Sequence, residues 1–106
     1  MKVTRIEYFF KGWFVGDFEP SFLKTKAAEV AIKTYSRGEV EQLHYHKVAT
    51  EITAIISGEV LMNNVKYITG DVIRIDPGEK TNFEAITDVT TVVVKVPGAS
   101  NDKYLA

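Results

Sequence analysis

The 106-residue sequence contains no cysteine, so disulfide bridges and thiolate metal sites are excluded. It has 13 lysine and arginine residues against 14 aspartate and glutamate residues, and so lacks the basic excess typical of nucleic-acid-binding proteins. No apolar run approaches the roughly 20 residues of a membrane-spanning helix, and the N-terminus has no signal-peptide core. These absences predict a cytoplasmic protein without nucleic-acid or membrane partners, folded as one domain over residues 1–106.

Sustained helical periodicity is also lacking, whereas short alternating segments recur along the chain. Asn63-Asn64 tolerates positive φ and is typical of a two-residue hairpin loop. The strands expected from alternation and turn signals are residues 3–10, 29–35, 51–57, 59–62, 65–68, 72–75, 82–86 and 89–96. Many short strands predict an all-β sandwich or antiparallel β-barrel. Residues 97–106 have the composition of a loose C-terminal tail.

Six of the twelve aromatic residues fall between positions 8 and 18. Glycines at 12 and 16 and a proline at 20 interrupt any regular period there. We interpret this segment as an aromatic plug at one end of the barrel or as a dimer contact. The alternative is a stacking surface for a sugar or another planar ligand.

The only two histidines, His44 and His46, stand two residues apart, and Glu51 follows five residues after His46. Residues two apart point to the same face of a β-strand, so one strand would aim both imidazoles into one space. Gln42 shares this parity and is expected to line the same space. Two imidazoles and a carboxylate favour either a metal site or a general acid–base cluster.

The spacing around these residues resembles the first motif of the cupin superfamily: Gly, five residues, His-x-His, three or four residues, Glu, six residues and Gly. Its fixed positions are filled here by Gly38, His44, His46, Glu51 and Gly58. Residues 70–83, with a Pro-Gly turn at 77–78, are similar to the second cupin motif, so the motif region spans 38–83. The resemblance implies a jelly roll, a homodimer and a small-molecule ligand.

The second motif departs from the family at Thr81, where a third metal-binding histidine usually stands. His44, His46 and Glu51 still match a facial triad of two histidines and one carboxylate. The resemblance therefore implies a divalent transition metal, with Fe, Mn, Ni, Co and Zn all left open. A fourth protein ligand would have to come from the second motif: Thr81, Asn82, Glu79 or Glu84.

Three functions are open at this point. The first is a small metal-binding cupin, enzyme-like, acting on a small polar organic molecule. The second is a metal-free isomerase or epimerase of a sugar derivative, with His44 or His46 as general base and Tyr35 as the acid. The third is a non-catalytic small-molecule sensing domain.

Substrate contacts are expected from side chains that flank the histidines in the two motifs: Gln42, Thr81 and Phe83. A substrate with an anionic group would also need an inward cation. Lys33 and Lys95 lie in alternating segments, but we expect both to be exposed to solvent, as most lysines are.

Overall fold

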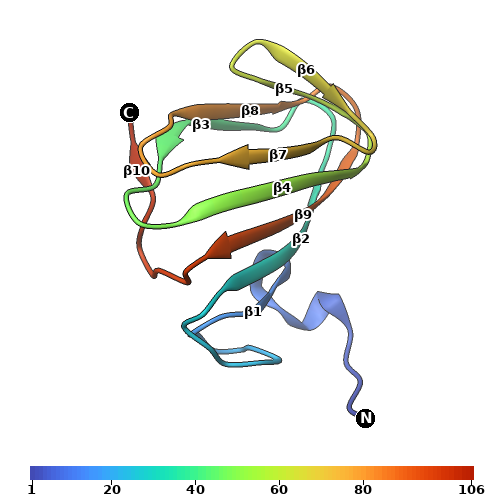
Figure 1. Cartoon of the computed structure of the whole chain (residues 1–106). Coiled ribbons are helices and arrows are strands. Elements are labelled where there is room, and N and C mark those ends of the chain that lie inside the picture. Colours follow the sequence, from blue (N-terminus) through green and yellow to red (C-terminus); the bar gives the residue numbers. More distant parts are fainter.

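The computed structural model describes residues 1–106 and contains two five-stranded antiparallel sheets (Figure 1). The strands are β1 (Trp13–Val15), β2 (Glu29–Tyr35), β3 (Val40–Tyr45), β4 (Thr50–Ser57), β5 (Glu59–Met62), β6 (Val65–Ile68), β7 (Val72–Ile75), β8 (Thr81–Ala85), β9 (Val89–Val96) and β10 (Tyr104–Leu105). One sheet has the order β1-β2-β9-β4-β7, and the other has the order β10-β3-β8-β5-β6. The predicted all-β, jelly-roll architecture is confirmed. The N- and C-termini lie at opposite ends of the molecule (Figure 1).

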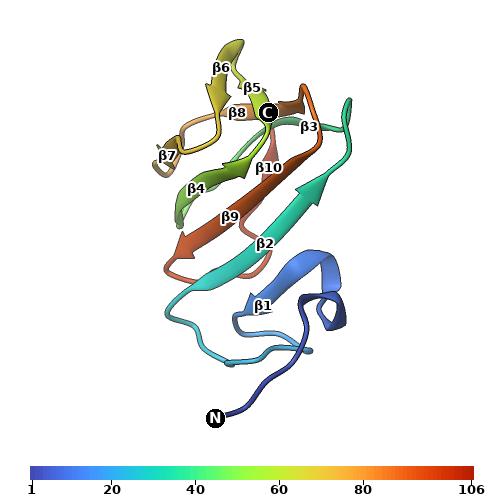
Figure 2. The ribbon, with the colours of Figure 1, turned by 90° about the vertical axis from the view of Figure 1, so that its right-hand side faces the viewer.

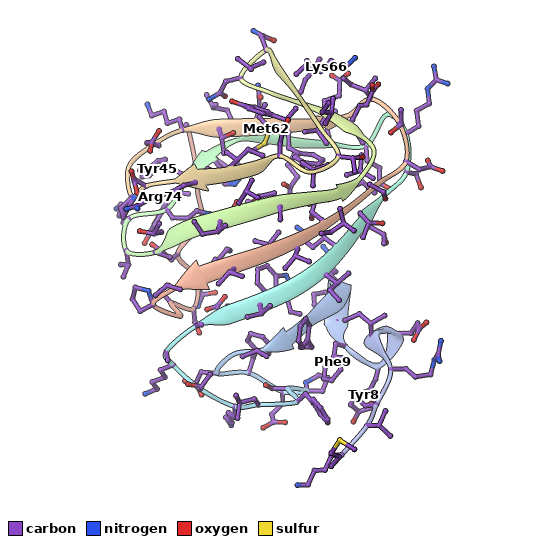
Figure 3. The ribbon with its side chains drawn as sticks, turned by 45° about the vertical axis from the view of Figure 1, so that its right-hand side comes forward. Tyr8, Phe9, Tyr45, Met62, Lys66 and Arg74 are labelled. Atoms are coloured by element: carbon purple, nitrogen blue, oxygen red, sulfur yellow. The ribbon has the colours of Figure 1, made fainter.

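The hydrophobic core lies between the two sheets and takes side chains from both. Ile55 on β4 and Val60 on β5 are fully buried within it. Met62 lies between the sheets, whereas the side chains of Lys66 and Arg74 lie on the outside (Figure 3). Each fully buried aliphatic side chain contributes about 1.5–3 kcal/mol, so this core holds the sheets face to face.

The hairpin between β5 and β6 has the predicted turn. Asn63 and Asn64 both have positive φ, at 51° and 65°. This backbone twist matches the twist of the flanking strands and fixes the register, in which Met62 pairs with Val65.

The prediction of a strand over residues 3–10 is wrong. This segment forms two single turns of 3-10 helix, η1 (Ile6–Tyr8) and η2 (Phe10–Gly12), and the first strand begins only at Trp13. Gly12 has a φ of 80°, and a Cβ there would lie 1.9 Å from the carbonyl oxygen of Ile32. The chain therefore turns against β2 where only glycine fits. Figure 2 shows these turns beside β1, toward the N-terminal end. No helix is long and apolar enough to cross a bilayer.

The structure also differs from the prediction that residues 97–106 form a loose tail. Tyr104 and Leu105 form β10, which pairs with β3 at the edge of its sheet. Before β10, the carboxylate of Asp102 accepts hydrogen bonds from three consecutive backbone N–H groups, at 2.9–3.3 Å: Lys47, Val48 and Ala49. The composition of residues 97–106 does not reveal this order, because it depends on one buried carboxylate that binds the backbone of residues 47–49.

Candidate active site

A cavity of about 230 Å³ lies between the sheets, next to the hydrophobic core. Six of the residues predicted for the site line it: Tyr35, His44, His46, Glu51, Thr81 and Phe83. They come from four strands, β2, β3, β4 and β8, and from the residue that follows β3. Both histidines are buried, with 5% and 4% of their surface exposed. The structure therefore brings residues of both sequence motifs to one space.

The prediction that Gln42 lines this space is wrong, because β3 contains a β-bulge. Glu41 pairs with Phe83 and His44 with Thr81, so three steps along β3 match two along β8. The extra residue reverses the alternation between 41 and 44. Glu41 therefore faces the cavity, while Gln42 is exposed on the outside.

His44 has its tautomer fixed by the bulge. Its Nδ1 lies 2.8 Å from the backbone carbonyl oxygen of Gln42. A carbonyl can only accept, so Nδ1 carries the proton and Nε2 keeps a free lone pair. Burial lowers the pKa of His44, against a smaller opposing effect of this hydrogen bond. At neutral pH His44 is therefore an uncharged base lining the cavity.

His46 is oriented by the C-terminal segment. Its Nδ1–H donates to the backbone carbonyl of Asp102. The other ring nitrogen, Nε2, therefore points away from that carbonyl. Nε2 lies 3.4 Å from Oε1 of Glu51. Without a proton both atoms are acceptors, so a proton between them makes the contact favourable. His46 and Glu51 therefore form an acid–base pair.

Glu51 is held as a carboxylate. Burial favours its neutral form, but the His46 ring, the Lys95 ammonium and the hydroxyl of Thr53 together outweigh that effect and lower its pKa. The Thr53 hydroxyl donates to Oε2 at 3.0 Å, while Oε1 faces His46. Both carboxylate oxygens therefore have partners, which fixes the orientation of the group.

Thr81 lies beside His44 as its register partner across β3 and β8. Its hydroxyl donates to the carbonyl oxygen of Asn82 at 2.9 Å. Glu79 and Glu84 are exposed, and Oε1 of Glu79 accepts a backbone N–H in its turn. None of these residues completes a ligand set with the two histidines.

For a divalent metal, which the cupin resemblance implies, the donor chemistry fits but the arrangement does not. Free imidazole nitrogens and an ionised carboxylate are suitable ligands. However, no three His, Asp or Glu side chains are grouped closely enough to hold an ion. As placed, these side chains do not form a metal site.

Tyr35 points into the cavity from β2, and its ring packs against Phe83 with centroids 4.4 Å apart. Burial, aided by the nearby Glu41 carboxylate and opposed by Lys33, raises the pKa of Tyr35 to about 12. The phenol therefore keeps its proton at neutral pH and can donate a hydrogen bond. Phe83 belongs to the hydrophobic core and supplies an apolar wall.

The expectation that Lys33 and Lys95 are exposed to solvent is wrong, because both line the cavity. Lys33 shares a face of β2 with Tyr35, and Nζ of Lys33 lies 3.2 Å from Oε1 of Glu41. Burial would lower the pKa of Lys33, but the Glu41 carboxylate and Tyr35 outweigh it and raise the pKa. Lys95 lies between Glu51 and Glu29 in the register of its sheet.

The cavity is also lined by residues that the sequence did not single out, among them Lys11, Trp13, Thr91 and Lys103. Thr91 could have been found, since it alternates with Val93 and Lys95 along β9. Trp13 lies on β1 in the aromatic segment, and Nζ of Lys95 lies 4.9 Å from its ring centroid. This segment therefore contributes a wall of the cavity.

The fold is similar to several solved structures. An uncharacterized conserved protein with a double-stranded β-helix domain from Klebsiella pneumoniae is 23% identical, with a TM-score of 0.71 over 79% of this chain and 74% of that one. A predicted oxalate decarboxylase from Thermotoga maritima is 31% identical, with a TM-score of 0.61 over 68% of each chain. A cupin superfamily protein from Desulfitobacterium hafniense is 9% identical, with a TM-score of 0.63 over 68% and 69%. No family model and no curated protein matches the sequence.

Proposed function

The chain belongs to the cupin superfamily, and we propose that it is an enzyme-like cupin that moves protons on a small polar organic molecule bound between its sheets. The observation that carries this proposal is the difference between the two histidines. His44 has a free Nε2 and a lowered pKa, whereas Nε2 of His46 lies against the carboxylate of Glu51. One imidazole suits a general base, and the other suits a proton donor.

The reaction class that fits this pair is an isomerisation or epimerisation. His44 accepts a proton from a carbon of the bound molecule through Nε2. The His46–Glu51 pair returns a proton to a neighbouring carbon or to the opposite face, so that atoms and charge balance. The phenol of Tyr35 donates a hydrogen bond to the oxygen on which negative charge develops. A sugar derivative offers this combination of acidic C–H groups and polar oxygens.

Metal-dependent chemistry is the second candidate, and the tautomers of the histidines favour it. Both Nδ1 atoms donate to backbone carbonyls, which leaves both Nε2 atoms available as ligands. A metal held by His44, His46 and Glu51 would supply Lewis acidity. The side chains would first have to come closer together than they are, because they form no three-residue group.

A proton-exchange experiment separates these candidates. Chelator-treated protein is incubated in D2O with a panel of small sugars, sugar acids and hydroxy acids, and proton NMR follows the loss of C–H signals. We expect exchange without added metal, abolished by His44→Gln, which removes the base. Thr90→Val is the control, because Thr90 lies on β9 and faces away from the cavity.

The outcomes point to different functions. Exchange only after metal is restored, with about one ion per chain that is lost in His46→Ala, would replace the proposal by the metal-dependent candidate. Binding of a panel member without exchange would favour a non-catalytic sensing domain. The homodimer and the cytoplasmic location stay predictions, and sedimentation velocity of the untagged protein would measure the oligomeric state.

A further inference from the structure

Thr91 carries a buried hydroxyl without a partner in the wall of the cavity. Its residue is 1% exposed, and its Oγ1 is the one buried side-chain polar atom that forms no hydrogen bond. A buried hydroxyl without a partner lowers stability, and an isosteric valine would avoid that cost. Because Thr91 lines the cavity, a change in its side-chain rotamer would bring the hydroxyl to a bound molecule, which can supply the missing partner.

Lys33 is the cross-strand neighbour of Thr91. Lys33 on β2 and Thr91 on β9 are register partners on the cavity side of the sheet, which places their Cβ atoms about 5 Å apart. The Lys33 ammonium uses one of its three N–H groups on Glu41, at 3.2 Å. It therefore has donors left for an acceptor that also bonds to Thr91.

The charges around the cavity also favour an anion. Four lysines, Lys11, Lys33, Lys95 and Lys103, line it against two glutamates, Glu41 and Glu51, which leaves two positive charges in excess. Lys95 forms no ion pair, since no carboxylate oxygen lies within 4.0 Å of its ammonium, and it lies over the Trp13 ring instead. Opposite charges in a partly enclosed space attract one another more strongly than they do in water.

We propose that the molecule bound by this site carries a carboxylate, one oxygen of which accepts hydrogen bonds from the hydroxyl of Thr91 and the ammonium of Lys33. Lys95 supplies a second positive charge near Glu51. This inference rests on the proposed function, because the carboxylate anchors the molecule in the cavity that also contains the two histidines. The group beside Lys33 should carry one negative charge, as each carboxylate of a dicarboxylate does, rather than the two of a phosphate group, because the Glu41 carboxylate also lies beside Lys33.

Binding of succinate tests the subsite without any turnover. Succinate is titrated into the full-length protein, and its affinity is read from amide shifts in NMR spectra. We expect Thr91→Val to bind succinate about ten-fold more weakly, as the loss of one hydrogen bond to a charged group predicts. Thr90→Val, the neighbouring outward-facing control, should stay within about two-fold of the wild type. Uncharged succinamide should not bind.

Thermal unfolding of the same variants without ligand separates a binding role from a structural one. Thr91→Val should unfold at the wild-type temperature or higher, because it removes an unpartnered hydroxyl. Weaker succinate binding with unchanged or raised stability supports the proposal. Wild-type affinity for succinate in Thr91→Val would overturn it, and so would a lowered unfolding temperature.

Two further measurements complete the design. Lys95→Met replaces a cation by an apolar chain of similar length and should also weaken succinate binding, even where Thr91→Val does not fold. Binding of inorganic phosphate in place of succinate would overturn the carboxylate assignment. Succinate binding without proton exchange on any substrate would refute the proposed function but leave the subsite intact. Proton exchange by a protein that binds succinate no more tightly than succinamide would refute the carboxylate subsite but support the proposed function.

Discussion

Replacing Asp102 by asparagine should destabilise the protein by about 2–4 kcal/mol. The carboxylate accepts hydrogen bonds from three consecutive N–H groups, and bonds to a charged acceptor contribute about 1.5–3 kcal/mol each. Lys47 and Val48 are exposed, so their N–H groups can bond to water instead. Ala49 is buried, and its N–H depends on this carboxylate. Asparagine keeps one acceptor oxygen, which limits the loss.

Urea unfolding at pH 7 measures this difference, with Asp88→Asn as the control. Asp88 accepts a single N–H bond, from the backbone of Arg37, and its replacement should cost about 1 kcal/mol or less. A loss of unfolding free energy below about 0.5 kcal/mol for Asp102→Asn, the range usual for substitutions without a structural role, would refute the role of this carboxylate. The amide protons of residues 47–49 should also exchange faster in the variant.

The stability that Asp102→Asn removes should depend on pH. Burial opposes ionisation of Asp102, but the N–H groups of Ala49, Lys47 and Val48 outweigh it and lower its pKa. A group with a lowered pKa stabilises the fold above its ordinary value of about 3.9, and that contribution is lost as the pH falls below it. The difference in unfolding free energy between wild type and Asp102→Asn should therefore become smaller below pH 4. An undiminished difference at pH 3 would contradict this reasoning.

The remaining predictions concern the core, a turn and a histidine. Ile55→Ala empties a fully buried position and should cost about 2–5 kcal/mol in urea unfolding. Gly58→Ala should cost about 2 kcal/mol or more, because φ is 104° and the new Cβ would lie 2.4 Å from the carbonyl oxygen of Asp88. Burial lowers the pKa of His44, so wild-type stability should fall as the pH drops below about 6.5, and His44→Gln should reduce that slope.

The strands and the histidine site followed from local patterns. Alternation set the bounds of β2, β6, β7 and β9, and the Asn-Asn pair set the hairpin turn between β5 and β6. Two histidines on one face and a carboxylate beyond the next turn predicted that these three residues lie together, and all three line one cavity. These features depend on neighbours in sequence, which is why a single sequence is sufficient to predict them.

The errors came from contacts between distant residues. The bulge that exposes Gln42 and turns Glu41 inward depends on how β3 pairs with β8, and no residue of β3 signals it. The attachment of Asp102 joins residues more than fifty positions apart. Lys33 and Lys95 follow the alternation of their strands into the cavity, which here outweighs the general preference of lysine for solvent.

The opposite roles of the two histidines depend on their proton positions, which long-range proton–nitrogen NMR of the metal-free protein at pH 7 reads for each ring. We predict a neutral His44 with its proton on Nδ1, and an Nδ1 proton on His46 as well. Glu51→Gln should change the Nε2 signal of His46 and leave that of His44 in place. An Nε2–H tautomer for His44, or a doubly protonated His44 at this pH, would show that it is not the base and would contradict the proposed proton transfer.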